Sequence, residues 1–546
     1  MPNIQVRNLG EIGSVPDASP WDLPLNGFDM AVNARFDENK IKRSIAFKSL
    51  GTTNTNNVGR FIIGGTATSG FDSIIIASSD YHLYSYSPSA NTYTQKLAGG
   101  GSYNSNEQFS GIVFDNGFYI TRPDRVPQYL SLSSSGNFGD LANWDANERC
   151  RVLRSFNSFL IALNITKAST SHPTMVKWSD VKVDNVNPGW DETNASLLAA
   201  ENTIADMPSE IVDGLPLRNS FFIYSRDQIW RMDFIGGNDI FSFNKVFEKT
   251  GLINTNCVVE VDGKHYCFGL DDLYVHDGVT KQTIADGRVR KFIFDGINTS
   301  DNSGEVSKAF FVTYNAVAKE VLFCYTSGDA HVASDLTGSA RCNRAAVFNI
   351  TNSTWAFIDL PNVSSATNAS LNLAVATYDA QSQTYDNTGF TYASQDAQDF
   401  VRRSLFVSEP HGSGNHNVKE VMVLDNVDSG SVAKPATSRV LNASFARRLQ
   451  IDLDEQGTPL SGYKNIRNIY PQATITTGAL TFNLSSSDIP TDTFTTNLTK
   501  TFTPSTDYKI DTRLAGRYLN YEVRETNGKD YSLSGFDMDI ITSGRR

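Results

Sequence analysis

The sequence predicts an all-β protein, and three observations support that class. Short apolar runs alternate with tight polar turns along most of the chain, and one hairpin pattern recurs many times. Helical periodicity is scarce, with residues 195–202 as the best short candidate for a helix. Only 19% of the 546 residues are charged, and polarity comes mainly from Ser, Thr, Asn and Gly, a composition that disfavours disorder and coiled coils.

The recurring pattern is an apolar run, a polar turn containing Asp, and a second run that opens with an aliphatic and an aromatic residue. Such pairs of runs are typical of β-hairpins, because β-branched and aromatic residues favour strands while Asp, Ser and Gly accept turn conformations. Three clear copies occupy residues 73–84, 221–230 and 266–274. Looser copies begin near Phe118, Ser158, Glu320 and Arg403.

The spacing of these hairpins indicates the architecture. They begin about 40 to 80 residues apart, and the shortest intervals match a propeller blade of about 40 to 50 residues. Radial repetition of similar small sheets leaves only short, protected edges. We therefore predict a β-propeller over residues 41–430, with six blades favoured and seven as the alternative count.

The chain ends in a separate β-domain. Gly, Ser, Ala and Pro cluster at residues 428–436 without periodicity, which indicates a domain boundary. Alternating runs at residues 473–484 and 518–523 follow, so we predict a C-terminal β-sandwich-like domain over residues 431–546. Residues 1–40 are irregular, and we expect an extended segment that packs on this C-terminal domain or on the propeller.

Net charge and cysteine content exclude several classes of protein. The 47 Lys and Arg against 59 Asp and Glu give a formal charge of −12, which argues against wrapping of nucleic acid or binding to an anionic membrane. No apolar run approaches the about 18 residues of a membrane helix, so no membrane insertion is expected. No secretion signal is apparent, and the five widely spaced cysteines predict buried, reduced thiols in a protein made in a cytoplasm.

The densest group of chemically active side chains lies within one predicted hairpin. Carboxylates and imidazoles two residues apart share a face of a strand, so they could bind a metal or relay a proton. Asp-Gly pairs at residues 262–263 and 277–278 have turn chemistry instead, and we favour turn and surface roles for the group. Its members are Asp262, His265, Asp271, Asp272, His276 and Asp277.

Other candidate sites are weaker, and we predict neither a metal nor a cofactor. His411 and His416 flank a Gly-Ser-Gly-Asn loop that would need a third metal ligand from elsewhere. Asp452, Asp454 and Glu455 resemble clustered glycosidase or calcium oxygens, but the spacing of a calcium loop is not completed. The sequence contains neither a phosphate-binding Gly-Lys-Ser/Thr loop nor a nucleophile elbow in a strand-to-helix context. We therefore expect a protein that is not an enzyme.

Arginine pairs are unusual in an acidic chain. They occur at Arg402–Arg403, Arg447–Arg448 and Arg545–Arg546, and they suit either contacts with a partner's carboxylates or phosphates, or intrachain ion pairs. Among the six tryptophans, Trp178 and Trp190 lie near strand signals, so we expect core packing for them.

A further set of short strings covers most of the chain in a fixed order. The first part, residues 17–36, includes Trp-Asp-Leu-Pro at 21–24 and Asn-Ala-Arg at 33–35. The middle strings lie at residues 149–153, 176–180, 188–191, 212–217 and 236–241. The last strings lie at residues 445–448, 469–472, 511–518 and 533–537, with Gly-Arg at 544–545. Together these strings resemble the tail nozzle, or tubular B-type, proteins of short-tailed bacteriophages.

This resemblance implies a structural protein of the virion. Family membership would mean a homohexameric ring below the portal and the head-to-tail adaptor, with one propeller per subunit and a platform domain that contacts neighbours. The channel of the ring would retain packaged double-stranded DNA and conduct it during ejection without sequence recognition, and the outside would offer docking surface to tail fibres or spikes. Subunit or adaptor contacts are then expected at Arg447, Arg448, Arg513, Arg517, Arg545 and Arg546.

The acidic charge is compatible with such a conduit, because each neutralised phosphate adds affinity that would stall the passing DNA. Two alternatives remain open: a carbohydrate-binding or carbohydrate-cleaving propeller of host recognition, and a propeller scaffold inside cells. Long polar loops at residues 298–305, 327–339 and 379–396 are candidates for gate or docking elements.

Overall fold

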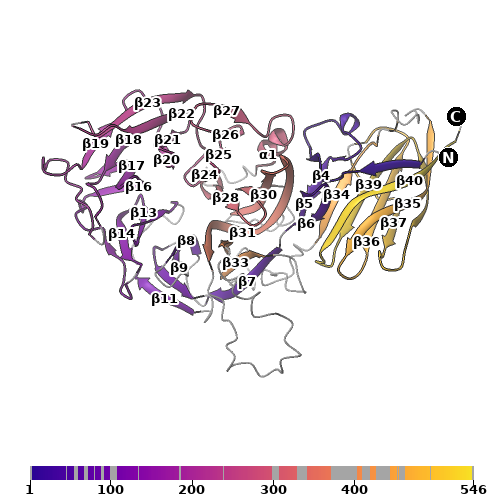
Figure 1. The fold of residues 1–546 in the computed structure, drawn as a ribbon, viewed down its shortest axis with the longest axis horizontal. Helices are drawn as coiled ribbons and strands as arrows, with labels where there is room; N and C mark the ends of the chain where they lie inside the picture. The colour runs from indigo at the N-terminus through magenta and orange to yellow at the C-terminus, as the bar shows by residue number, and fades with distance from the viewer. Residues whose placement is uncertain are drawn as a thin grey trace, which may run out of the picture.

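The chain folds almost entirely into β-strands, as Figure 1 shows. The computed structural model describes residues 3–44, 46–53, 59–66, 72–78, 80–87, 92–98, 107–132, 134–183, 186–237, 239–297, 306–328, 341–370, 402–408, 419–425, 443–451, 453, 462–491 and 493–543. Within these residues the helical elements are α1 (Arg290–Gly296) and two 3-10 turns, η1 (Pro20–Asp22) and η2 (Val306–Ala309). The predicted all-β propeller class is confirmed. The helix expected at residues 195–202 is not formed, because strand β19 begins at Ala200.

Five four-stranded antiparallel sheets follow one another along the chain, and each pairs its strands in sequence order. The first contains β8 (Gly59–Thr66), β9 (Asp72–Ser78), β10 (Leu83–Ser87) and β11 (Thr92–Leu97). The second contains β12 (Ser110–Phe114), β13 (Gly117–Arg122), β14 (Arg125–Ser131) and β15 (Gly139–Asp140). The third contains β16 (Glu148–Phe156), β17 (Phe159–Lys167), β18 (Thr170–Trp178) and β19 (Ala200–Thr203). The fourth contains β20 (Ile211–Leu217), β21 (Ser220–Ser225), β22 (Gln228–Phe234) and β23 (Phe241–Glu248). The fifth contains β24 (Val258–Val261), β25 (Lys264–Phe268), β26 (Leu273–His276) and β27 (Lys281–Thr283).

Two further blades share one long strand. The sixth contains β28 (Phe311–Asn315), β29 (Glu320–Tyr325), β30 (Cys342–Asn349) and the first half of β31 (Thr354–Ser370). The second half of β31 begins the seventh blade and pairs with β32 (Arg402–Ser408), which pairs with β33 (Lys419–Asp425). Strand β7 (Ala46–Thr53), from near the start of the chain, pairs with β33 and completes that blade.

The described residues therefore form seven propeller blades, the alternative count of the sequence prediction instead of the favoured six. Its circle closes where β31 of the seventh blade packs against β8 of the first, with Ile62 N donating to Ser365 Oγ and Gly64 N donating to Thr367 Oγ1. A count of hairpins in the sequence does not reveal the seventh blade. Its first strand continues the last strand of the sixth blade, and its last strand comes from near the start of the chain.

A second β-domain, which we call the platform, lies beside the sixth blade and contains both ends of the chain (Figure 1). One sheet contains β38 (Ile510–Gly516), β35 (Tyr463–Ile475), β40 (Tyr531–Ser543), β6 (Lys40–Arg43) and β5 (Ala34–Asp37), with β1 (Asn3–Arg7) paired to β40. The other contains β4 (Met30–Val32), β34 (Ser444–Arg448), β39 (Tyr518–Glu525), β36 (Leu480–Ser487) and β37 (Leu498–Phe502). A short parallel pair, β2 (Gly13–Ser14) and β3 (Gly27–Phe28), adjoins them. The two sheets enclose one apolar core.

The segment expected to be extended contributes strands to both platform sheets. β1 pairs with β40, and β4 joins β34 of the platform to β31 of the propeller. The propeller strands run from Ala46 to Asp425, and the later platform strands run from Ser444 to Ser543. The platform is thus assembled from residues that are more than 400 positions apart in sequence.

Local turn chemistry explains why the predicted hairpins form. In the first blade Ser78 Oγ donates to Asp80 Oδ1 and accepts from His82 N, which closes the turn between β9 and β10. In the fourth blade Ser225 Oγ donates to Asp227 Oδ1 and accepts from Gln228 N between β21 and β22. Ser and Asp therefore form hydrogen bonds in the turns, where backbone groups have no partner in the strand ladder.

Candidate functional site

Two of the predicted contact arginines bind the N-terminal segment of the same chain. Arg447 Nε on β34 donates to Asp29 Oδ2 at 2.8 Å, and Asp29 Oδ1 accepts from Leu449 N at 2.9 Å. Arg448 is fully buried, and its Nη2 donates to Leu23 O at 2.6 Å. These contacts fasten the N-terminal segment to the platform. The expectation of a subunit or adaptor contact at Arg448 is therefore wrong for this chain, because its side chain has no exposed surface.

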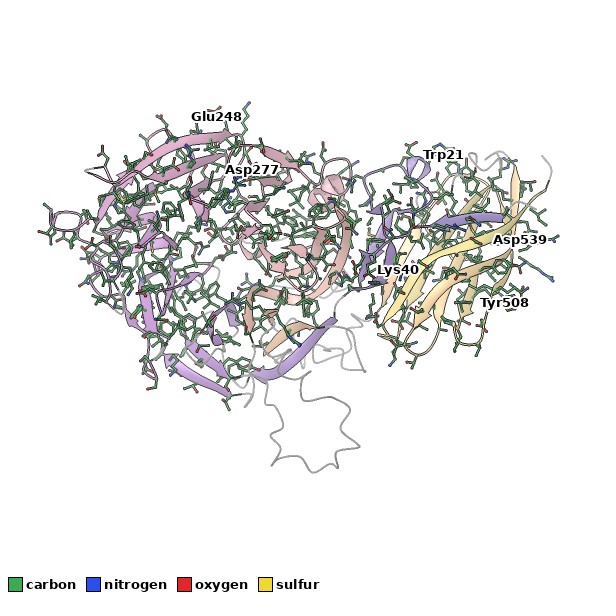
Figure 2. The ribbon with its side chains drawn as sticks, in the orientation of Figure 1. Trp21, Lys40, Glu248, Asp277, Tyr508 and Asp539 are labelled. Carbon is green, nitrogen blue, oxygen red and sulfur yellow. The ribbon has the colours of Figure 1, made fainter. Side chains whose placement is uncertain are left out.

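The predicted arginines of the last third lie on an open edge. Strand β38 ends one platform sheet, and among the described residues it pairs only with β35. Arg513 is exposed on this strand, and Arg517 lies just after it, 5.5 Å from the ring centre of Tyr463. Figure 2 shows Tyr508, two residues before the strand, on the outside of the platform, where it is 75% exposed. Arg545 and Arg546 lie outside the described residues.

An edge strand is a natural contact element, because its outer backbone N–H and C=O groups have no ladder partner. On β38 the exposed side chains alternate with buried ones, so Asp511, Arg513 and Ala515 share the outward face. Lys509 forms an ion pair with Asp511 at 2.6 Å between Nζ and Oδ1. The outward face therefore carries both signs of charge, with Arg513 beside that pair.

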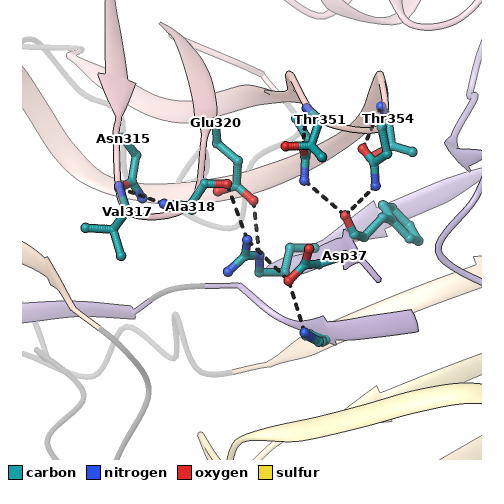
Figure 3. Close-up of polar contacts among 12 residues, drawn as sticks. Asp37, Asn315, Val317, Ala318, Glu320, Thr351 and Thr354 are labelled. Atoms are coloured by element: carbon teal, nitrogen blue, oxygen red, sulfur yellow. Dashed lines mark hydrogen bonds and ion pairs between the residues drawn. The ribbon is translucent and has the colours of Figure 1, made fainter. Parts of the chain in front are cut away.

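The junction between platform and propeller is fixed by directional polar contacts (Figure 3). Arg35 Nε on β5 lies 3.1 Å from Glu320 Oε1 at the start of β29, and both side chains are largely buried. Phe36 O accepts from Asn349 Nδ2 at 3.1 Å and from Asn352 Nδ2 at 2.9 Å. Burial raises the pKa of Glu320 to about 7, although Arg35 acts to lower it.

Backbone pairing extends the same junction. Asn33 N donates to Phe357 O at 2.7 Å, and Asn33 Oδ1 accepts from Asp359 N at 3.0 Å. Asn33 Nδ2 donates to Ala443 O at 2.9 Å, so one side chain contacts β31 on one side and the start of β34 on the other. Asn33 adopts a positive φ of 54°, a conformation that Asn tolerates better than most residues. The motif Asn-Ala-Arg at residues 33–35 thus forms the side of the platform that faces the propeller.

The structure brings together the two histidines of the predicted polar group and separates them from its carboxylates. His265 and His276 are buried, and Tyr224 Oη lies 2.5 Å from His265 Nδ1 and 2.7 Å from His276 Nε2. His265 Nε2 lies 3.0 Å from Pro216 O, and Gly278 N donates to His276 Nδ1 at 3.1 Å. Burial lowers the pKa of His265 to about 4 and that of His276 to about 3.

The carboxylates of this group, Asp262 included, lie between strands. Asp277 Oδ1 accepts from Val279 N and Thr280 N, and these backbone donors lower the pKa of Asp277 to about 2. Asp272 Oδ1 accepts from Thr283 Oγ1 at 2.8 Å, and Asp271 is exposed near Arg290. Within the part of the chain that is described, no group of three or more His, Cys, Asp or Glu could hold a metal.

The other predicted residues are either buried or lie outside the described residues. All five cysteines are buried, and Trp178 and Trp190 are buried in the propeller core, as predicted. His411, His416, Asp452, Asp454 and Glu455 lie outside the described residues, as do nearly all residues of the three predicted gate or docking loops. Across the described segments, no helix is long and apolar enough to cross a membrane.

The propeller axis contains a polar network that the sequence analysis did not single out. Arg154 on β16 donates to Ser110 Oγ of the second blade at 2.6 Å and to Gly214 O of the fourth at 3.1 Å. Its Nη2 lies 2.8 Å from Asp213 Oδ1 and donates to Asn256 Oδ1 at 3.1 Å. The sequence signal was the opposite charges of Arg154 and Asp213 within two predicted strands, because buried charges need partners.

Comparisons with known proteins add little to this description. No family model and no curated protein matches the chain. Similar solved structures include the computationally designed Ika8 protein, with a TM-score of 0.36 and 9% identity, covering 69% of this chain and 99% of that one. They also include the WD40 β-propeller domain of Doa1, with a TM-score of 0.38 and 10% identity, covering 69% of this chain and 97% of that one. At these values the likenesses carry no functional argument, and the propeller is defined by its own sheets.

Proposed function

We propose that this chain is a structural subunit of a short bacteriophage tail. In this proposal it is made in the cytoplasm of a host bacterium and forms a ring of six copies, the nozzle, below the portal and the head-to-tail adaptor. The ring retains packaged double-stranded DNA and conducts it during ejection, and its outside docks tail fibres or spikes. The role is structural and involves no catalysis.

One observation carries the proposal: the strings that resemble nozzle proteins converge in space. Those from the two ends of the chain meet in the platform, where Asp29 binds Arg447 and Leu23 binds Arg448. The string at residues 469–472 pairs with the string at 533–537 between β35 and β40. The middle strings, residues 149–241, fall in the third and fourth blades. Strings that are scattered in sequence thus belong to two structural units, the platform and a pair of blades.

The open edge of the platform suits contact between copies. An exposed edge strand pairs readily with another chain, and β38 combines such an edge with the outward Arg513. Six subunits at −12 give 6 × −12 = −72 formal charges, so the ring as a whole would repel the DNA backbone instead of gripping it.

Assembly tests the contact directly. Replacement of Arg513 by Glu reverses an outward charge on β38 without touching the core, so we expect it to reduce ring formation at least tenfold at equal protein concentration. Lys249→Glu is the matched control, because Lys249 is exposed directly after β23 of the fourth blade. Sedimentation velocity would measure both variants. If R513E and K249E assembled equally well, β38 would not be part of the subunit contact.

The alternative function, a carbohydrate-binding or carbohydrate-cleaving propeller of host recognition, makes a different prediction. A cleaving enzyme needs two carboxylates about 5 to 10 Å apart around the scissile bond. Incubation of the purified protein with host surface polysaccharide distinguishes the two functions. Release of oligosaccharides by a monomer would favour the alternative, whereas ring formation without turnover favours the tail subunit.

A further inference from the structure

Exposed apolar side chains gather at one face of the propeller. Because the strands of a blade are antiparallel, the link between its first and second strands lies at the same face as the link between its third and fourth strands, and successive blades repeat this arrangement. In the described part of the propeller, eight of the nine large apolar side chains that are exposed lie in such links or at the end of the strand before them. The eight are Val181, Val183, Val186 and Leu198 in the third blade, Phe234 and Ile235 in the fourth, Val279 in the fifth and Val317 in the sixth. Leu270, between β25 and β26, lies at the opposite face.

The six exposed residues of the third and fourth blades lie around one aromatic cluster. The ring centre of Phe234 lies 5.9 Å from that of Phe159 and 5.9 Å from that of Phe241. The ring centre of Trp178 lies 5.2 Å from that of Phe241, and Trp178 Nε1 donates to Leu198 O at 3.0 Å. Exposed side chains from two neighbouring blades therefore cover the same buried aromatic rings.

The loop after β18 belongs to the same surface. Lys182 N donates to Ser158 O at 2.8 Å, which holds the loop against the start of β17. The side chain of Lys182 is buried, and its Nζ lies 2.8 Å from Asp115 Oδ2, so this lysine adds no free charge. Val183 and Val186 pair with each other through a β-bridge and expose their side chains. We use the name apolar patch for the six residues Val181, Val183, Val186, Leu198, Phe234 and Ile235.

The charges at the edge of the apolar patch are negative. Asp239, in the turn between β22 and β23, is exposed. Asp180, two residues after β18, is partly exposed, and its Oδ1 accepts from Leu198 N at 3.1 Å. Neither carboxylate forms an ion pair with another described residue. A surface that is both apolar and positively charged would therefore complement the patch.

The open edge of the platform has that complementary composition. Two large apolar side chains are exposed in the described part of the platform, and both flank β38. Tyr508 lies two residues before the strand. Ile489 lies two residues after β36, whose Ser486 Oγ donates to Ala515 O near the other end of β38. An edge strand between two exposed apolar side chains is suited to contact with another protein.

The same edge carries positive charge. Arg513 is exposed on β38, and Arg467 is exposed on β35, which pairs with β38. Neither arginine forms an ion pair within the described part of the chain. Figure 1 shows the third blade, with β18 and β19, at the end of the molecule away from the platform. The apolar patch and the β38 edge therefore cannot meet within one chain.

We propose that the apolar patch binds the β38 edge of a second copy of this chain. Arg467 and Arg513 of one copy would lie opposite Asp180 and Asp239 of the next, and both groups of exposed apolar side chains would be buried. The contact is heterologous, because each copy contributes one surface of each kind, and repeated contacts of this type form a closed ring when the rotation between copies closes. The inference rests on the proposed function, since it assigns the two surfaces that meet between neighbours in the ring.

A single charge in the patch tests its part in assembly. Ile235→Asp adds a carboxylate where a carboxylate rim already repels anions, so we expect ring formation to fall at least tenfold at equal protein concentration. Leu270→Asp is the matched control, because Leu270 is 48% exposed, close to the 57% of Ile235, but lies at the opposite face. Val183→Asp is a second variant in the third blade and should act as I235D does. Sedimentation velocity would measure assembly, and thermal unfolding would confirm that all three variants fold.

A mixture of two defective variants tests whether these two surfaces meet each other. I235D retains an intact β38 edge, and R513E retains an intact apolar patch. One edge and one patch therefore remain compatible, so the mixture should form pairs with one copy of each variant. Such pairs cannot grow, because the two surfaces left over are both defective. A fluorescent label on I235D would identify the pairs in sedimentation velocity.

The outcomes separate this contact from the proposed function. Rings from the wild-type protein, loss of rings in I235D and in R513E, and pairs in their mixture would support the contact. Rings that form equally well from I235D and L270D, or a mixture of I235D and R513E without pairs, would overturn the contact and leave the tail function standing. A wild-type protein that never assembles, alone or with the adaptor, would overturn both.

Discussion

At the residue scale, the contact of Tyr224 with two histidines defines a complete chain of hydrogen bonds. Gly278 N donates to His276 Nδ1, so the proton of neutral His276 is on Nε2 and points at Tyr224 Oη. The hydroxyl can then donate to His265 Nδ1, and His265 Nε2 donates to Pro216 O. Every donor has an acceptor only when both imidazoles are neutral. These hydrogen bonds join Tyr224 of the fourth blade to the two histidines of the fifth.

Removal of the central hydroxyl should therefore destabilise the propeller. In Tyr224→Phe the donor of His276 and the acceptor of His265 lose their shared partner inside the core, which we expect to cost about 1–3 kcal/mol. Urea denaturation would measure the change in the free energy of unfolding. Tyr508→Phe, at a position that is 75% exposed, is the control and should change stability little. Equal stability of the two variants would contradict the hydrogen-bond chain.

The same pair predicts how stability depends on pH. Burial lowers the pKa of His265 and His276 from 6.5 to about 4 and about 3, so the unfolded chain takes up protons before the folded one. Their contribution is fully present above pH 6.5 and is lost as the pH falls from there toward 3. Denaturation curves between pH 7 and pH 4 should show a shallower decline for His276→Gln than for the wild-type protein. Parallel declines would assign the acid sensitivity to other groups.

At the element scale, strands from the first 53 residues complete sheets whose other strands lie hundreds of residues later. β1 alternates buried and exposed side chains, with Ile4 and Val6 in the platform core and Gln5 and Arg7 outside. β7 supplies the last strand of the seventh blade. Both the platform and the closed propeller therefore depend on the N-terminal segment.

A single charge in β1 tests that dependence. Val6→Asp places a carboxylate in the platform core without a partner, which we expect to lower the free energy of unfolding by about 3 kcal/mol or more. Gln5→Asp adds the same carboxylate on the exposed face of the same strand and should have little effect. Thermal unfolding followed by circular dichroism would compare them. A small effect of V6D would show that β1 adds little to the platform.

The junction between the two domains predicts a pH effect of opposite sign. The pKa of Glu320 is raised from 4.5 to about 7 by burial, so the folded chain holds this proton over a range where the unfolded chain has lost it. The stabilising contribution of the protonated carboxyl is full below pH 4.5 and is lost as the pH rises through 7. Glu320→Gln keeps a neutral side chain at every pH and should reduce the loss of stability between pH 5 and pH 8. A wild-type slope that the substitution leaves unchanged would contradict this assignment.

What the sequence predicts depends on the range of the interactions. The hairpins at residues 73–84, 221–230 and 266–274 are local, because Ser, Asp and Gly in the turns decide them, and all three form. The burial of Arg448 could not be predicted, because its acceptor, Leu23 O, lies 425 residues away. The sequence prediction favoured six blades over seven for the same reason, because β7 and β33, which pair in the seventh blade, are distant in sequence.

At the scale of the whole molecule, one platform built from both chain ends stands beside a closed seven-bladed propeller (Figure 1). Strand β4 pairs with β31 of the propeller and with β34 of the platform, so the two domains share one continuous sheet. Together with the buried contact of Arg35 with Glu320, this sheet favours a unit that moves as one body. Such a unit could present β38 in the same orientation from every copy of a ring.

The mass of the purified protein in solution tests the central claim most directly. Light scattering would measure it alone and after mixing with the portal and adaptor complex of the phage that encodes it, and negative-stain images would show the symmetry of the product. We predict a closed ring of six copies, formed alone or on the adaptor. A protein that remains monomeric at every concentration and does not bind the adaptor would contradict the proposed function.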